Sequence, residues 1–251
     1  MEAPIPRTVQ GVKILGIDLA AEPKNTGVVL VDWDSGGAVA HLIADKATES
    51  TLVALARKVD KIGVDAPLGW PVGFVEAMTS HSTYAGWPPG ADRTRLRYRV
   101  TDHVVQEITG IWPLSVSTDK LGVVALRCAH LQELFAAEVW NGTRAPRDGS
   151  GPLVETYPTA ALKAWGLRYR GYKREEGRGV RQVIVDELQR RVELEEVRES
   201  AIHSDHVLDA LISALLVIDV VNHTTLLPRN EEEQVAALAE GWIHVPTTVV
   251  P

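Results

Sequence analysis

The sequence predicts an α/β fold in which a mixed five-stranded sheet is flanked by helices. Short runs of β-branched and apolar residues, separated by turn signals, alternate with helical patterns of apolar residues. Two of these runs end in an aspartate that is followed at once by a turn, which is typical of strands that deliver a carboxylate to one edge of a sheet. The strands are expected at residues 12–18, 27–32, 38–44, 61–65 and 152–158.

The first three strands form an antiparallel meander, because the turn at residues 34–37 contains Ser-Gly-Gly and favours a hairpin. Residues 49–60 then place apolar side chains at helical spacing, and the next strand ends in Asp65. A crossover helix returns this strand parallel to the first and next to it. Asp18, which ends the first strand, is therefore expected beside Asp65. For either aspartate alone, the alternative is a solvated turn residue.

Residues 70–118 are rich in Pro, Gly and Trp, which predicts a loop-rich insertion rather than sheet. We expect this insertion to lie above the edge of the sheet that carries Asp18 and Asp65. Four arginines alternate within it, and in an extended chain their guanidinium groups share one face suited to phosphates. The alternative is a solvated face that pairs with the protein's own carboxylates. These candidate substrate-binding residues are Arg93, Arg95, Arg97 and Arg99.

Helices are expected at 122–140, 159–165 and 180–191. Between the last two lies a second basic and aromatic cluster, residues 168–174, whose Tyr172 and Lys173 suit contact with a polyanion. A plain exposed loop is the alternative for this cluster. Near the end of the chain a helix from Asn230 to Glu240, opened by a capping box, precedes a small strand or edge segment at 241–246.

The helix that begins after Ser204 carries the most information. Ser204 is a plausible N-cap, and the helix is almost wholly apolar to Val221, so it is expected to cover the sheet. Asp205, His206 and Asp209 form one polar face at its start. An acidic first turn that stabilises the helix dipole explains Asp205. It explains Asp209 less well, because an unpaired carboxylate inside so apolar a helix is costly to bury, and a metal ion would account for it.

The composition predicts one soluble, cytoplasmic domain at residues 11–251, preceded by a flexible tail at 1–10. The chain has 251 residues, 45% of them hydrophobic, and a formal net charge of −7, which argues against indiscriminate coating of nucleic acid or anionic membranes. A single cysteine excludes an intramolecular disulfide. No apolar run approaches the about 20 residues that span a bilayer, so no membrane association is expected.

Four acids lie at strand ends or at the start of the apolar helix, namely Asp18, Asp65, Glu155 and Asp209. Oxygen ligands of this kind suit Mg²⁺ or Mn²⁺, and zinc-type Cys/His spacing is lacking in the sequence. Two such ions can activate water and stabilise the leaving oxygen of a phosphodiester, so the pattern predicts phosphodiester hydrolysis. Nucleic acid, either DNA or RNA, is the expected partner, and a homodimer is an assembly left open.

Three motifs carry a resemblance to known proteins: Gly63-Val-Asp65-Ala-Pro-Leu-Gly69, Glu155-Thr-Tyr-Pro158 and His206-Val-Leu-Asp209-Ala-Leu211. With the meander that ends in Asp18, they resemble domain-of-unknown-function family 429, predicted nucleases of the ribonuclease H-like superfamily. The last motif is also similar to the final catalytic helix of RuvC-type junction resolvases. The resemblance covers nearly the whole chain.

The resemblance implies roles for individual residues. Asp18 would bridge two metal ions, Asp65 and Asp209 would each hold one, and His206 would lie near the attacking water or a ligand position. Glu155 and Asp205 are additional candidates, Glu155 as a catalytic residue and Asp205 as a metal ligand.

The sequence is also compatible with two other functions. One is a catalytically silent protein that keeps the fold and binds nucleic acid or regulates a partner, which the net acidity favours. The other is a nucleotide-binding phosphotransferase of the actin and sugar-kinase type, which shares the β-β-β-α-β topology. Asn25-Thr26-Gly27 is a poor version of the phosphate-binding hairpin of such enzymes, and one such unit is present where two are expected.

Overall fold

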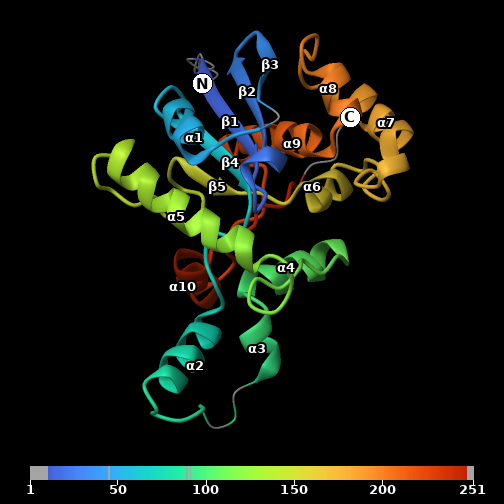
Figure 1. Cartoon of the computed structure of the whole chain (residues 1–251). Coiled ribbons are helices and arrows are strands. Elements are labelled where there is room, and N and C mark those ends of the chain that lie inside the picture. The colour runs from blue at the N-terminus through green and yellow to red at the C-terminus, as the bar shows by residue number, and fades with distance from the viewer. Residues whose placement is uncertain (1–10, 45, 89, 91, 248–251) are drawn as a thin grey trace, which may run out of the picture.

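Five strands form one mixed sheet in the computed structural model, which describes residues 11–44, 46–88, 90 and 92–247. The sheet order is β3-β2-β1-β4-β5, with β1 antiparallel to β2 and parallel to β4. This confirms the predicted meander and the crossover through α1 (Glu49–Ala56) (Figure 1). The predicted tail at 1–10 lies outside the described residues. The strands are β1 (Val12–Asp18), β2 (Gly27–Asp34), β3 (Gly37–Ala44), β4 (Lys61–Asp65) and β5 (Leu153–Glu155).

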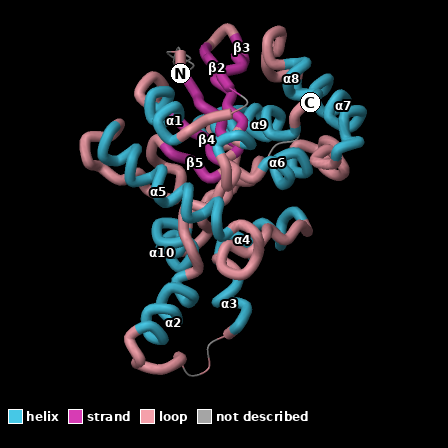
Figure 2. The backbone as a smooth tube through the Cα atoms, viewed as in Figure 1, coloured by secondary structure: helices cyan, strands magenta, loops and turns pink. Residues whose placement is uncertain are grey.

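Helices cover both faces of the sheet (Figures 1 and 2). One face packs against α9, with α6, α7 and α8 around it, and the other packs against α1 and α5. No helix among the described residues is long and apolar enough to cross a membrane. The remaining helices are α2 (Val72–Ser82), α3 (Arg93–Arg97), α4 (Val100–Thr109), α5 (Gly122–Glu138), α6 (Pro158–Ala164), α7 (Arg178–Leu188), α8 (Arg198–His203), α9 (Asp205–Val221) and α10 (Glu231–Glu240).

The alternation of side chains along β1 decides which face receives its terminal acid. Leu15 and Ile17 are buried against the α1 and α5 side, whereas Ile14 belongs to the core on the α9 side. Successive side chains of a strand point to opposite faces. Asp18 therefore lies on the same face as Ile14, which is the face covered by α9.

Glycines let α9 approach the sheet closely. A Cβ atom added at Gly16 would lie 1.9 Å from the carbonyl oxygen of Ala210, and one added at Gly63 would lie 2.5 Å from that of Ser213. Both positions are in neighbouring strands, β1 and β4, directly beneath α9. Only a residue without a side chain permits this distance, so the two glycines set how near α9 comes to the strand ends.

The predicted cap of α9 is confirmed, because the Ser204 hydroxyl accepts a hydrogen bond from the backbone N–H of Val207. Beyond the first turn the helix is buried on nearly every side. The cap and the apolar surface together fix where α9 begins, and so where Asp209 lies over the sheet.

The insertion at 70–118 is more helical than predicted. It contains α2, α3 and α4, and the pair α2–α3 forms an arm that extends away from the sheet (Figures 1 and 2). The extended reading of the arginines is wrong, because Arg93–Arg97 is a short helix. A local contact favours this helix, because the Asp92 carboxylate caps it by accepting a hydrogen bond from the backbone N–H of Thr94.

The C-terminal elements follow the sequence prediction closely. Asn230 caps α10 by accepting from the N–H of Glu233, and the helix ends at Glu240. The segment after it forms single bridges rather than a strand, with Ile243 beside Glu155 of β5. This bridge extends the edge of the sheet next to the acid-bearing strands.

Candidate metal centre

Three carboxylates meet at the carboxyl ends of β1 and β4. Asp18 and Asp65 are register partners in these parallel strands, and Asp209 reaches them from the first turns of α9. One oxygen from each residue lies within 4.8 Å of the others. The predicted meeting of these acids, separated by many residues in the sequence, is therefore confirmed.

Burial makes this cluster electrostatically costly. Burial is the main cause that raises the pKa of Asp65 well above its ordinary value, and the charges of Asp18 and Asp209 raise it further. Burial likewise raises the pKa of Asp209 to about 6. Like charges at this separation disfavour joint ionisation, so a cation placed among them is strongly favoured.

Two neighbours in the second basic cluster hold Asp209. The Lys173 ammonium nitrogen lies 2.6 Å from one carboxylate oxygen of Asp209, and 4.0 Å from Asp65. The buried Tyr172 hydroxyl donates to the other Asp209 oxygen at 2.8 Å. Because that hydroxyl donates to Asp209, the Thr159 hydroxyl, 3.1 Å away, donates to the Tyr172 oxygen. The structure thus places Tyr172 and Lys173, expected to contact a polyanion, against the acids themselves.

His206 is joined to Asp18. Its Nδ1 lies 2.6 Å from an Asp18 carboxylate oxygen, which as an acceptor requires the proton on that nitrogen. This hydrogen bond and the Asp18 charge raise the pKa of His206, against the opposing effect of burial. Asp205, the first residue of α9, is not among the acids whose oxygens meet within the described chain.

Glu155 has a different environment from the three aspartates. Arg99 lies 2.8 Å from one of its carboxylate oxygens and donates to the other, which also accepts from the N–H of Leu68 at 3.0 Å. Arg99 is itself buried and pairs with Asp102. Both oxygens of Glu155 are therefore engaged in a buried ion-pair network. Glu155 does not belong to the group of three aspartates whose oxygens meet.

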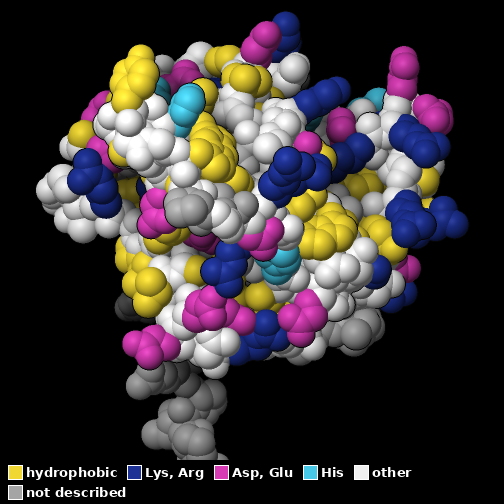
Figure 3. All heavy atoms as spheres, turned by 90° about the horizontal axis from the view of Figure 1, so that it is seen from below, with side chains coloured by type: hydrophobic (Ala, Val, Ile, Leu, Met, Phe, Trp, Pro, Cys, Tyr) yellow, Lys and Arg dark blue, Asp and Glu magenta, His cyan; other side chains and the backbone are white. Residues whose placement is uncertain are grey.

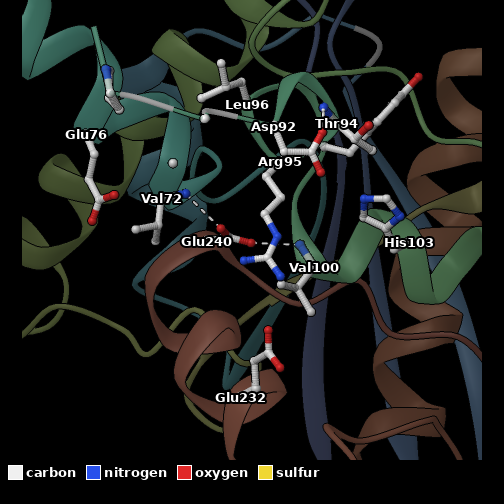
Figure 4. Close-up of a pocket in the computed structure, with 14 residues that line it drawn as sticks. Val72, Glu76, Asp92, Thr94, Arg95, Leu96, Val100, His103, Glu232 and Glu240 are labelled. Atoms are coloured by element: carbon white, nitrogen blue, oxygen red, sulfur yellow. Dashed lines mark hydrogen bonds between the residues drawn. The ribbon is translucent and has the colours of Figure 1, made fainter. Parts of the chain in front are cut away.

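The other arginines of the insertion do not share one face. Arg97 lies 3.6 Å from Asp119, and Arg93 is exposed on α3. Arg95 extends into a cavity of about 840 Å³ enclosed by α2, α3, α4 and α10 (Figure 4). Glu240 in this cavity accepts from the backbone N–H groups of Val72 and Val100, and so anchors the first turns of α2 and α4. The cavity does not include the three aspartates.

Two features beside the acids were not predicted from the sequence, namely the ion pair of Arg99 and the position of Tyr157. Arg99 is a buried partner of Glu155, and Tyr157 lines a cavity that begins at Asp65. Tyr157 follows β5 within the Glu-Thr-Tyr-Pro motif, and its place in this motif could have identified it as a candidate site residue. Arg99 gave no such signal, because its partner lies 56 residues away.

The donor set fits a hard divalent cation. Carboxylate oxygens are the ligands that Mg²⁺ and Mn²⁺ take in proteins, and three of them converge here from rigid elements. Asp18, Asp65 and Asp209 are the residues that would hold such an ion. A mixed five-stranded sheet with this acidic edge and helices on both faces defines an α/β protein consistent with the ribonuclease H-like fold.

The chain belongs to the family described as "Protein of unknown function (DUF429)", whose family model matches residues 16–233. That range includes all three aspartates and the whole sheet apart from the first residues of β1. Comparison with curated proteins and with solved structures found no match.

Proposed function

We propose that this protein is a divalent-metal-dependent nuclease that hydrolyses phosphodiester bonds in nucleic acid. The convergence of the Asp18, Asp65 and Asp209 oxygens within 4.8 Å carries the proposal. When bound there, Mg²⁺ or Mn²⁺ supplies Lewis-acid stabilisation of phosphate charge and a water of lowered pKa. The setting we propose is the cytoplasm, as expected from the sequence.

The chain's own residues prepare the centre for this chemistry. The His206 hydrogen bond fixes the orientation of the Asp18 carboxylate, and the Tyr172 hydroxyl fixes that of Asp209. The Lys173 side chain is 46% exposed, so its ammonium can leave Asp209 and contact a phosphate oxygen of the substrate. These contacts orient the acids and place one mobile cation at the edge of the site.

Basic residues next to the centre support a polyanionic substrate. Arg168, Arg170 and Arg174 are exposed in the loop that leads from α6 to α7 and carries Lys173. Figure 3 shows Lys and Arg side chains at the right, where α7 lies, interspersed with Asp and Glu, so the basic excess is confined to residues 168–174. In a chain of net charge −7, this local excess favours the approach of nucleic acid at one place.

The test is cleavage of labelled single-stranded and duplex DNA and RNA by the purified protein. We expect cleavage with Mg²⁺ or Mn²⁺, none with excess EDTA, and a loss of at least about 100-fold in Asp18→Asn, since removing one ligand charge disables the centre. Asp34→Asn is the matched control, because Asp34 also ends a strand but is exposed at the end of β2. Cleavage that resists EDTA, or that survives in Asp18→Asn, contradicts the proposal.

The Lys173–Asp209 ion pair favours a second candidate function. A cation supplied by the chain already neutralises part of the acidic cluster, as expected of a protein that keeps the fold and binds nucleic acid without cleaving it. Binding of nucleic acid by the wild type that is unchanged by EDTA and by Asp18→Asn, with no cleavage, would identify this function.

A further inference from the structure

A cavity of about 270 Å³ opens beside the metal centre. Asp65 and Lys173 belong both to this cavity and to the acidic centre. Its other walls come from the segment after β4, from the insertion and the residues just before α5, from the segment after β5 and from the C-terminal segment. The bridge between Glu155 and Ile243 holds the C-terminal segment beside β5. A ligand in this cavity would therefore lie in contact with the residues of the centre.

The walls of the cavity are mainly apolar. They include Pro67, Leu114, Leu121 and Ile243, and the polar part of the lining consists of Asp65, Arg99, Glu155, Thr156, Tyr157, Thr159 and Lys173. At about 270 Å³ the space is slightly smaller than the roughly 300–1,000 Å³ typical of small-molecule sites. It has room for one ring-sized group and excludes a paired double strand.

Tyr157 supplies a hydroxyl-bearing side chain to the wall of this cavity. Its side chain is partly buried. A tyrosine hydroxyl is protonated at neutral pH. A protonated hydroxyl is both donor and acceptor, which suits the polar edge of a heterocycle.

We propose that this cavity, here named the base cavity, binds one unstacked nucleobase of the substrate next to the metal centre. The inference rests on the proposed function and deepens it. A flat heterocycle offers apolar faces to the walls and polar edges to Tyr157, while its own phosphate remains near Asp65 and Lys173. Bases inside a duplex cannot reach such a cavity without leaving the stack. The substrate is therefore single-stranded, frayed or unpaired nucleic acid.

The first test measures binding without catalysis. Adenosine, cytidine, guanosine and uridine are titrated separately into the whole protein in EDTA, by calorimetry. We expect at least one nucleoside to bind, and binding to weaken about tenfold in Leu114→Trp, whose indole occupies the cavity. Leu227→Trp is the matched control, because Leu114 and Leu227 are 55% and 54% exposed and only Leu114 lines the cavity.

A second variant removes one oxygen atom. Tyr157→Phe is expected to weaken nucleoside binding about threefold to tenfold, the effect of one lost hydrogen bond. Tyr84→Phe is its control, since Tyr84 is 97% exposed. Because this change is small, it tests the proposal even if Leu114→Trp does not fold.

The two proposals fail in different ways. Cleavage that depends on Asp18 but acts equally on single strands and blunt duplexes, with Leu114→Trp and Tyr157→Phe like wild type, overturns the base cavity and leaves the nuclease proposal standing. Nucleoside binding that both variants weaken, in a protein without cleavage, supports the base cavity and overturns the nuclease proposal. No nucleoside binding by the wild type at millimolar concentration overturns the base cavity.

Discussion

The ammonium nitrogen of Lys173 lies 2.6 Å from the carboxylate of Asp209, among the three acids that meet at the edge of the sheet. The side chain comes from the loop before α7, in which Arg168, Arg170 and Arg174 are exposed and Tyr172 is buried. A cation supplied by the chain would therefore compete with the divalent ion of the proposed centre for the same oxygens.

Replacing Lys173 should expose this competition. Lys173→Met is expected to bind Mn²⁺ about fivefold more tightly than wild type, corresponding to the roughly 1 kcal/mol of a half-exposed ion pair. Calorimetric titration with Mn²⁺ measures the affinity, and Lys120→Met, at an exposed position outside the centre, is the control. An unchanged or weaker affinity in Lys173→Met would show that the ammonium does not oppose metal binding.

Asp65→Asn should stabilise the metal-free protein at about pH 8. The folded pKa of Asp65 is raised above its unfolded value, so its contribution to stability is present below the unfolded pKa and is lost as pH rises through the folded pKa. At about pH 8 the Asp65 carboxyl therefore destabilises the folded wild type, whether it keeps its proton or ionises in the buried site, and asparagine does not titrate. The gain in melting temperature should disappear near pH 4, where the carboxyl is protonated in the fold.

Bound metal should make the wild type more stable than Asp65→Asn. At 100 times its dissociation constant, a bound ion stabilises the wild type by about 2.7 kcal/mol. Asp65→Asn, with one ligand charge removed, should gain much less from Mn²⁺, and Asp34→Asn should respond like wild type. Thermal unfolding with EDTA and with Mn²⁺ distinguishes these outcomes. Equal shifts in wild type and Asp65→Asn would remove Asp65 from the ligand set.

Gly16→Ala should damage the centre through the packing of α9. The added Cβ would lie 1.9 Å from the Ala210 carbonyl oxygen, so helix and strand must separate. We expect a loss of about 1–3 kcal/mol in the free energy of unfolding, typical of overpacking, and weaker Mn²⁺ binding because Asp209 moves with the helix. Urea unfolding and metal titration measure both effects.

The control for this change is another glycine. Gly179→Ala lies near the start of α7, where an added Cβ meets nothing within 4 Å. Alanine there should stabilise the protein by about 0.5–1 kcal/mol through helix propensity and leave metal affinity unchanged. If Gly16→Ala behaved like Gly179→Ala, close packing would not determine the position of α9.

The backbone of the site could be predicted because its signals are local. Strand alternation, a turn after each aspartate and one crossover helix were sufficient to bring Asp18 beside Asp65. The apolar pattern and Ser204 cap of α9 then identified the third acid. Each of these signals lies within a few residues of the feature that it predicts.

Side-chain partners across the fold could not be predicted in the same way. The alternate arginines were interpreted as part of an extended loop, but Arg93–Arg97 forms a helix capped by Asp92, and Arg99 is the buried partner of Glu155. Tyr172 was expected at the surface, yet it is buried and bonds to Asp209 across 37 residues. Such contacts depend on which loops lie side by side in the folded protein, and the spacing of residues in the sequence does not predict this.

The last prediction concerns His244, in the segment that closes the edge of the sheet. Its ring is buried, with Nε2 3.0 Å from the carbonyl oxygen of Asp148 and Nδ1 2.9 Å from the hydroxyl of Thr225. Because a carbonyl oxygen only accepts, the proton is on Nε2, and Nδ1 accepts from Thr225. Burial lowers the pKa of His244 to about 4.

Stability should therefore fall as the pH drops from about 6.5 to about 4. Between these pH values His244 binds a proton in the unfolded chain but not in the folded protein. The free energy of unfolding therefore decreases, by about 3 kcal/mol in total. Urea unfolding across this range should show a smaller decrease in His244→Gln, which lacks the titrating ring, than in wild type. His130→Gln, on the exposed side of α5, removes a histidine without touching the buried contact. If His244→Gln lost stability in acid as steeply as wild type and His130→Gln, the buried ring would not be the source of the acid sensitivity.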